Sequence, residues 1–177
     1  MRHLALSAIG RDRPGIVAGV SGDLLARAVN IEDSQMSILG GHFALVLILA
    51  GADDLDTDAL RADLERTAAR LELDALSLSE IADAGPSAEP SCIVTVYGVD
   101  HPGIVHAVAA VLGERGVNIT DLQTRLASEG EGALYAMTLE LSLPEGTSQA
   151  DLEEALARVR GEQGVQVSVR ELEQDVL

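Results

Sequence analysis

The chain has 177 residues, enough for one medium domain or two small ones, and 47% of them are apolar, enough to build a core. Its net charge is −17, it contains no lysine, and its 12 arginines are scattered along the chain. Because phosphate groups are bound by clustered cations, this composition argues against direct binding of nucleic acid and against anionic membranes. Solubility explains the acidity, and an acidic surface for a basic partner is the alternative.

Cysteine usage and hydropathy argue against a disulfide-bonded protein, a zinc protein and a membrane protein. The single Cys92 cannot form an internal disulfide, and no spacing of Cys and His resembles a zinc site, so we expect no metal and no cofactor. Residues 1–9 are too short for a signal peptide, and no apolar run approaches the length of a membrane-spanning helix. We therefore expect a cytoplasmic protein with no membrane partner.

The first half of the chain predicts six elements, and hydrophobic periodicity separates the helices from the strands. In chain order they are a strand over residues 3–9, a helix over 14–29, two strands over 30–39 and 43–49 joined by a glycine turn at 40–41, a helix over 56–71 and a strand over 73–81.

A short segment rich in proline and glycine, residues 84–90, follows and is typical of a linker. It separates an expected first domain, residues 1–83, from a second domain, residues 91–177. The second domain repeats the order of elements. These are a strand over 92–99, a helix over 102–115, a strand over 117–127, a polar turn over 128–132, a strand over 133–143, a helix over 148–160 with Ser148 as its cap, and a strand over 165–172.

The order strand–helix–strand–strand–helix–strand predicts an α+β fold of two tandem ferredoxin-like units. Each unit would be a four-stranded antiparallel sheet with both helices on one face. The other face would be bare, so we expect the second half or another chain to cover it.

The two halves also share a motif at a constant offset of 88 residues. Residues 10–17 read Gly-Arg-Asp-Arg-Pro-Gly-Ile-Val, and residues 98–105 read Gly-Val-Asp-His-Pro-Gly-Ile-Val. Further identities at the same offset pair Asn30-Ile31 with Asn118-Ile119, Asp33 with Asp121, and Gln35 with Gln123. Identity at several fixed positions without a gap indicates an internal duplication.

Each copy of the motif lies where the first strand leads into the first helix. Asp12 is predicted to be the N-cap and Pro14 the first helical residue. Gly15 would let another group approach the backbone, where the N–H groups of residues 15–17 have no helical partner. Such a helix start attracts a carboxylate or a phosphate.

Asn30 and Asn118 begin the second strand, which we expect beside the first strand and therefore near this turn. Helix N–H groups could then bind the carboxylate of an amino acid, while the Asn oxygen and the Asp carboxylate bind its ammonium group. Ordinary helix capping explains the same residues and stays open as the alternative. The copies differ at Arg13/His101 and Ala18/His106, so they need not bind the same ligand, and His101 is either a ligand contact or a polar residue at a helix start.

Catalysis is not expected. Ser7, Ser21 and Cys92 have no recognisable base and orienting partner, and the chain has neither a P-loop nor a dinucleotide fingerprint.

The turn Asp12-Arg-Pro-Gly-Ile-Val17, followed by Asn30-Ile31 in a unit of this size and order, resembles an ACT domain. Two such units with little else resemble the glycine cleavage system transcriptional repressor group. The resemblance implies regulatory binding of a small amino acid, with glycine or serine as the ligands it suggests, at an interface between ACT units. It also implies a homodimer and a protein partner such as a transcription regulator.

Carried onto this sequence, the ligand-binding residues are Asp12, Gly15, Ile16, Asn30 and Ile31 in the first copy, and Asp100, Gly103, Ile104, Asn118 and Ile119 in the second. Two alternatives remain open: a protein–protein adaptor with vestigial ligand sites, and a regulatory subunit of an enzyme of amino-acid metabolism.

Overall fold

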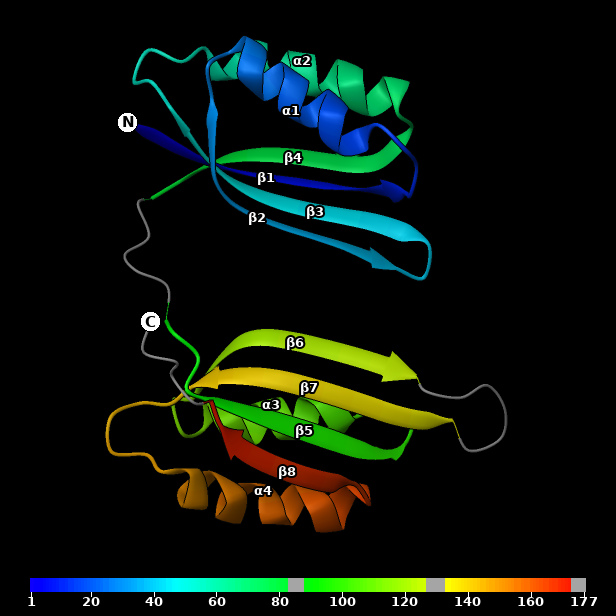
Figure 1. The fold of residues 1–177 in the computed structure, drawn as a ribbon, viewed down its shortest axis with the longest axis vertical. Coiled ribbons are helices and arrows are strands. Elements are labelled where there is room, and N and C mark those ends of the chain that lie inside the picture. Colours follow the sequence, from blue (N-terminus) through cyan, green and yellow to red (C-terminus); the bar gives the residue numbers. More distant parts are fainter. Residues whose placement is uncertain (83–87, 127–132, 173–177) are drawn as a thin grey trace. The chain divides into compact units, whose positions relative to one another are not determined.

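Each half of the chain folds into a four-stranded antiparallel sheet with two helices on one face, as the order of elements predicts (Figure 1). The computed structural model describes residues 1–82, 88–126 and 133–172. The linker expected at 84–90 lies largely outside these residues, and the turn expected at 128–132 lies wholly outside them.

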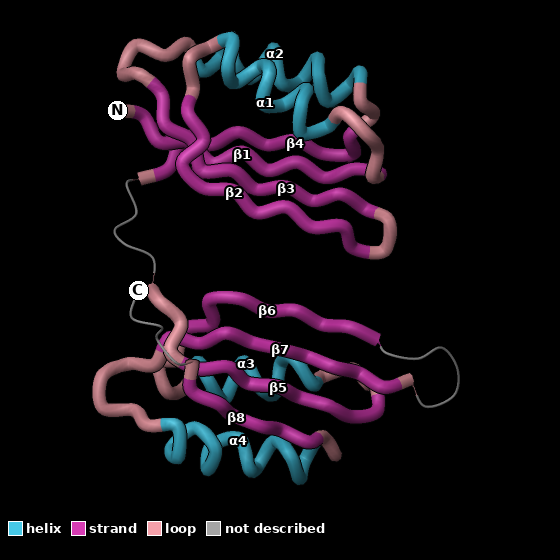
Figure 2. Tube along the Cα trace, in the orientation of Figure 1, coloured by secondary structure: helices cyan, strands magenta, loops and turns pink. Residues whose placement is uncertain are grey.

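The chain divides into two units, Met1–Gly85 and Pro86–Leu177. The first unit contains β1 (Arg2–Arg11), α1 (Ile16–Ala26), β2 (Asn30–Leu39), β3 (His42–Gly51), α2 (Thr57–Arg70) and β4 (Leu73–Ile81). The second contains β5 (Cys92–Val99), α3 (Ile104–Gly113), β6 (Asn118–Leu126), β7 (Leu134–Ser142), α4 (Gln149–Gln163) and β8 (Gln166–Glu171). Figure 2 shows the helices and strands of each unit by colour.

The sheet order corrects the expectation that the second strand of each unit lies beside the first strand. The strands lie in the order β2-β3-β1-β4 in the first unit and β6-β7-β5-β8 in the second. The second strand of each unit is therefore at the edge and does not pair with the first strand. The reason is topological, because β3 returns antiparallel from the β2 hairpin and takes the place beside β1.

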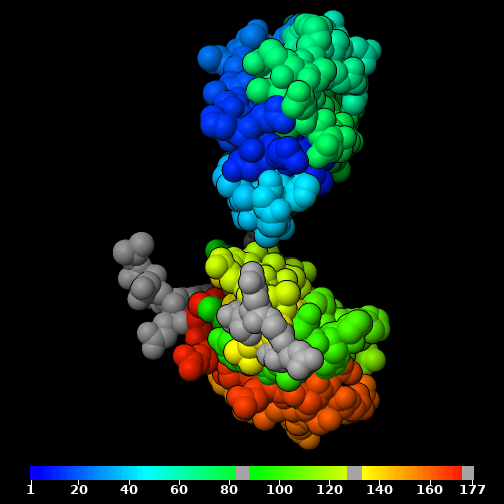
Figure 3. Space-filling view, turned by 90° about the vertical axis from the view of Figure 1, so that its right-hand side faces the viewer, coloured from blue at the N-terminus to red at the C-terminus, as the bar shows by residue number. Residues whose placement is uncertain are grey.

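The core of the first unit lies between its sheet and its helices. Alternate residues of β1, Leu4, Leu6 and Ala8, are buried, and they pack with Val20 of α1 and Leu60 of α2. In the space-filling view the N-terminal segments (blue) lie directly against the later helix and strand (green) (Figure 3). The core contains a single aromatic ring, that of Phe43, so packing is almost entirely aliphatic. Close packing of short side chains brings helices and sheet near each other.

The second unit builds its core in the same way. Val94 and Val96 of β5 and Met137 of β7 are buried under Val108 of α3 and Leu156 of α4. The opposite face of each sheet exposes apolar side chains, among them Ile9 and Val46 in the first unit and Tyr97 in the second. Both helices of each unit lie on the other face of its sheet, as the order of elements predicts (Figure 1).

The glycine that opens each copy of the motif has a packing role. A Cβ on Gly10 would lie 2.9 Å from a Leu73 side-chain carbon and 3.0 Å from its Cα. In the second unit a Cβ on Gly98 would lie 2.7 Å from a Val165 side-chain carbon. Both distances are too short for an added carbon, so the first strand can pack against the last strand only with glycine at this position.

The second helix of each unit has a side-chain cap. Asp56 accepts a hydrogen bond from the Ala59 N–H at 2.9 Å, and Ser148 forms a capping box with Asp151. The cap expected at Ser148 is confirmed. Its hydrogen bonds to the carboxylate lower the pKa of Asp151 below the usual value.

Candidate functional site

The turn before the first helix differs from the one expected. Helix α1 begins at Ile16, its N-cap is Gly15, and no side chain caps it. Gly15 has φ 94°, a left-handed conformation that favours glycine. The prediction of Asp12 as N-cap and of Pro14 as the first helical residue is therefore wrong, because the left-handed residue starts the helix later. The Asp12 N–H instead donates to the Gly41 carbonyl at 3.2 Å.

The second unit repeats this geometry. Gly103 is the N-cap of α3 with φ 107°, no side chain caps the helix, and the Asp100 N–H donates to the Ala133 carbonyl at 3.2 Å. The first N–H groups of any α-helix have no intrahelical acceptor, and here no capping side chain supplies one. In both copies the repeated motif thus builds an uncapped helix start.

The residue after the Asp ties each turn to the end of the second helix of its unit, by different chemistry in the two copies. In the first unit the Arg13 guanidinium forms an ion pair with Glu72 at 2.7 Å. In the second unit the two ring nitrogens of His101 lie 2.9 Å from the Gln163 carbonyl and 3.1 Å from the Pro102 carbonyl. Because both His101 nitrogens face protein carbonyls, this side chain positions the turn rather than pointing to a ligand.

A groove runs between α1 and the edge strand β2, and we call it the α1–β2 groove. One hollow lies at the turn, and the next lies further along the helix. The first is lined by Asp12, Arg13, Pro14, Gly15, Ile16, Val17, Ala18, Met36 and Phe43. The second has a volume of about 160 Å³ and is lined by Val17, Val20, Ser21, Ile31, Ser34, Met36, Leu45 and Leu47. The two hollows share Val17 and Met36, so they join.

The structure brings only some of the predicted residues together. Asp12, Gly15 and Ile16 line the hollow at the turn, and Ile31 lines the neighbouring one. Ile16 is buried in the core, as is Ile104 in the second unit, so each would offer a ligand its backbone N–H. Asp100 and Gly103 are exposed at the second turn, while Asn118 is exposed and Ile119 is partly buried on β6.

Asn30 lies at the other end of its unit. It pairs with Ala50, which pairs with His3 at the start of β1, whereas the turn follows Arg11. Eight residues of strand separate the two ends, roughly 27 Å at about 3.4 Å per residue. The expectation that the Asn amide lies near its own turn is wrong, because α1 runs back along the sheet before β2 begins. Asn118, which pairs with Ser142, is placed likewise.

The sequence reasoning missed the apolar residues of the groove, Val17, Val20 and Met36, because they match an ordinary helix stripe and a weakly alternating strand. It also missed Tyr135, which pairs with Gly98 as Phe43 pairs with Gly10. Aligning the two hairpins would have shown this exchange of Phe for Tyr. Tyr135 is 8% exposed, and its hydroxyl has no hydrogen-bond partner among the described residues.

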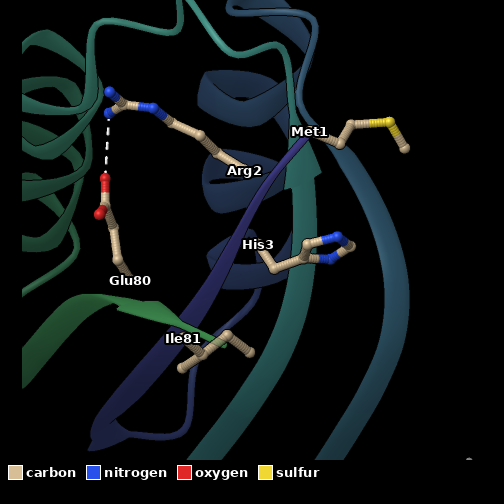
Figure 4. A pocket seen from close by; sticks show the side chains of 5 residues that line it. All are labelled: Met1, Arg2, His3, Glu80 and Ile81. Atoms are coloured by element: carbon tan, nitrogen blue, oxygen red, sulfur yellow. Dashed lines mark hydrogen bonds and ion pairs between the residues drawn. The ribbon is translucent and has the colours of Figure 1, made fainter. Parts of the chain in front are cut away.

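Another hollow lies at the start of β1 and is lined by Met1, Arg2, His3, Glu80 and Ile81 (Figure 4). Two of these lining residues, Arg2 and Glu80, form an ion pair at 3.0 Å. None of the residues of the repeated turn lines it, so it is separate from the candidate site.

Other kinds of site have little support in the described part of the chain. No group of three or more His, Cys, Asp or Glu side chains there could hold a metal ion. Cys92 is buried, and burial, with a smaller effect of Glu171, raises the pKa of its thiol. None of the described helices has the length and apolar character needed to cross a membrane.

The chain is thus a tandem pair of ferredoxin-like units, each with a glycine turn before its first helix. One ACT-domain family model matches residues 2–76, and a second matches residues 93–161. Together the matches cover most of the chain, which therefore belongs to the ACT-domain family.

Two named proteins and one solved structure are similar to this chain. The glycine cleavage system transcriptional repressor of Escherichia coli K12 is 27% identical over 94% of this chain and 88% of that protein. A phosphoserine phosphatase of Streptomyces coelicolor is 33% identical over 94% of this chain, which spans 39% of that protein. A solved structure of an unknown protein from Galdieria sulphuraria is 30% identical, with a TM-score of 0.78 over 97% of this chain and 98% of that one.

The hydrogen bonds of His101 predict that the stability of the second unit depends on pH. Hydrogen bonds to the Gln163 and Pro102 carbonyls, with a smaller effect of Asp100, raise the pKa of His101 above its ordinary value. A raised folded-state pKa adds stability that is complete below about pH 6.5 and is lost as pH rises through the folded value. The urea midpoint of the second unit should therefore fall as pH rises above 6.5.

His101→Gln is the matched variant and should remove this part of the pH dependence. The first unit serves as an internal comparison, since an ion pair of Arg13 with Glu72 takes the place of the histidine there. Equal slopes of midpoint against pH in wild type and His101→Gln would contradict this role of His101.

The buried hydroxyl of Tyr135 predicts a stabilising substitution. Burial, with a smaller effect of Asp100, raises the pKa of Tyr135, and no described residue gives the hydroxyl a hydrogen bond in return. Tyr135→Phe, which copies Phe43, should raise the free energy of unfolding by about 1 kcal/mol. The reverse change, Phe43→Tyr, should lower it. Chemical denaturation measures both, and a clear loss of stability in Tyr135→Phe would show that the hydroxyl is satisfied.

Proposed function

We propose that this chain is a non-catalytic regulatory protein that binds a small amino acid at its helix-opening turns and modulates a transcriptional or metabolic partner. The observation that carries the proposal is the duplicated, uncapped helix start at Gly15 and Gly103. Similarity to a transcriptional repressor over nearly the whole chain supports the regulatory part.

The physical basis is an accessible set of hydrogen-bond donors. An added Cβ on Gly15 would meet no protein atom within 4 Å, so the space over the first turn of α1 is open. The unpaired N–H groups and the helix dipole both favour a carboxylate there, with the dipole contributing roughly 0.3–2 kcal/mol. Asp12 lines the same hollow and would attract the ammonium group of an amino acid.

The position of Asn30 bears on how the site is completed. Since Asn30 lies at the far end of its own unit, a ligand at the Gly15 turn would need its amide contact from another ACT unit. A homodimer with the ligand at an ACT–ACT interface would supply one, and we propose this arrangement. The apolar side chains on the sheet face opposite the helices are a second reason to expect association.

The proposed partner is a protein rather than nucleic acid. A net charge of −17 repels a phosphate backbone and favours a basic protein surface. Ligand binding would change regulation only if it favours one of two states of the protein, so the amino acid must bind those states with different affinity.

Two other functions have an observation in their favour. The separation of Asn30 from its turn favours an adaptor with vestigial ligand sites, which would hold its partner with or without amino acids. The similarity to part of a phosphoserine phosphatase favours a regulatory subunit of an enzyme of amino-acid metabolism. Capture of the same protein partner in the presence and absence of amino acids would distinguish the adaptor from the sensor.

A thermal-denaturation panel of amino acids tests the proposal. A ligand at 100 times its Kd should add about 2.7 kcal/mol to the stability of the protein. Ala18 is exposed in the first turn of α1, and an Asp at this position stabilises a helix start while repelling a bound carboxylate. Ala18→Asp should therefore fold normally and lose the ligand-induced shift at the first site.

The second site has a matched variant, His106→Asp, at the equivalent position of α3. The neutral variant Ala18→Asn controls for shape and should keep a larger part of the shift than Ala18→Asp. Absence of any shift with every amino acid at millimolar concentration would contradict the proposed function.

A further inference from the structure

We infer that the α1–β2 groove of the first unit binds an aliphatic amino-acid side chain, so that this unit takes leucine, isoleucine, valine or methionine in preference to glycine or serine. The inference rests on the proposed function and names the class of ligand that the first unit recognises.

The second hollow of the α1–β2 groove, which we call the cavity, is lined mainly by apolar side chains. Leu45 and Leu47 of β3 form its floor, and each is only 4% exposed. Val20 of α1 and Ile31 of β2 contribute to the sides, and the polar lining side chains are only those of Ser21 and Ser34. A space of about 160 Å³ with such walls suits one aliphatic side chain and is too small for a helix.

The two units differ at Ser34, which lines this space in the first unit. Ser34 pairs with Leu47 on β3, and Leu122 occupies the same position in the second unit, where it pairs with Leu139. Three of the apolar lining residues, Val17, Val20 and Ile31, are identical at the offset of 88 residues. The second unit therefore has a leucine, 40% exposed, at the strand position where the first unit has the serine that lines this hollow.

The distance from the cavity to the backbone N–H groups at the start of α1 suits the length of an aliphatic amino acid. Val20 follows Ile16 by four residues, which is roughly 6 Å along a helix axis. An aliphatic amino acid spans about this length from its carboxylate to the end of its side chain. A ligand with its carboxylate on the first turn of α1 would therefore place its side chain between Val20, Ile31 and Ser34.

The rim of the groove fits the same ligand. Val17 is 50% exposed and Met36 is 48% exposed, and both lie where the hollow at the turn meets the cavity. A bound aliphatic side chain would cover these two apolar residues. Glycine would leave the cavity unfilled, and the serine hydroxyl would enter it with few polar partners.

Isothermal titration of the purified full chain with glycine, serine, leucine, isoleucine, valine and methionine tests the inference. At least one aliphatic amino acid should bind roughly tenfold to a hundredfold more tightly than glycine, the effect of burying its side chain. Ser34→Leu copies the second unit and should remove this preference, with an unchanged circular dichroism spectrum. Ser34→Val is a smaller replacement that should weaken it, and it serves if the leucine disturbs folding.

Ser37→Leu is the matched control. Ser37 lies on the same strand but pairs with Ala44, so its side chain points to the opposite face from that of Ser34. This variant should keep the wild-type preference. Binding of glycine or serine as tight as that of every aliphatic amino acid would overturn the inference and leave the proposed function standing. A folded Ser34→Leu protein that still prefers an aliphatic ligand would also overturn it, and no binding of any amino acid would overturn both.

Discussion

The left-handed glycine before each first helix is the constraint on which the rest of this structure depends. Because Gly15 and Gly103 adopt φ near 100°, the chain turns from strand to helix without a side-chain cap. The preceding aspartates are then held by backbone hydrogen bonds to the hairpin, and the first N–H groups of the helix remain available. The same turn brings Arg13 or His101 against the end of the second helix of its unit. Stability and the candidate site thus depend on one local conformation.

Duplication preserved this turn and changed what surrounds it. An ion pair positions one turn and a histidine positions the other, so the two turns are held by different chemistry. Ser34 lines a cavity beside the first turn, and Leu122 occupies the equivalent strand position of the second unit. Tyr135 replaces the ring of Phe43 and adds a buried hydroxyl. The two units are therefore related sites with different surroundings, which fits a protein whose copies recognise different ligands or in which only one copy binds.

Much of the fold could be predicted from the sequence, because it depends on local signals: hydrophobic periodicity, the glycine turn at residues 40–41, and the repeated motif. The site could be predicted only in part. Capping preferences favour Asp12 as the N-cap of α1. They do not reveal that Gly15 takes a left-handed conformation, so that the helix starts later. The distance of Asn30 from the turn depends on strand order, which is set by long-range pairing rather than by any local pattern. The cavity depends on which residues of α1, β2 and β3 meet, and the sequence identities alone do not show this.

The central claim is that the uncapped helix starts bind the carboxylate of an amino acid. Amide chemical shifts measured by NMR during titration of the isotope-labelled protein with a panel of amino acids test it most directly. We expect the largest shifts on the N–H groups of the first three residues of α1, of α3 or of both helices. These residues are Ile16, Val17 and Ala18 in α1, and Ile104, Val105 and His106 in α3. Shifts concentrated on the sheet faces opposite the helices, with these amides unchanged, would contradict the claim.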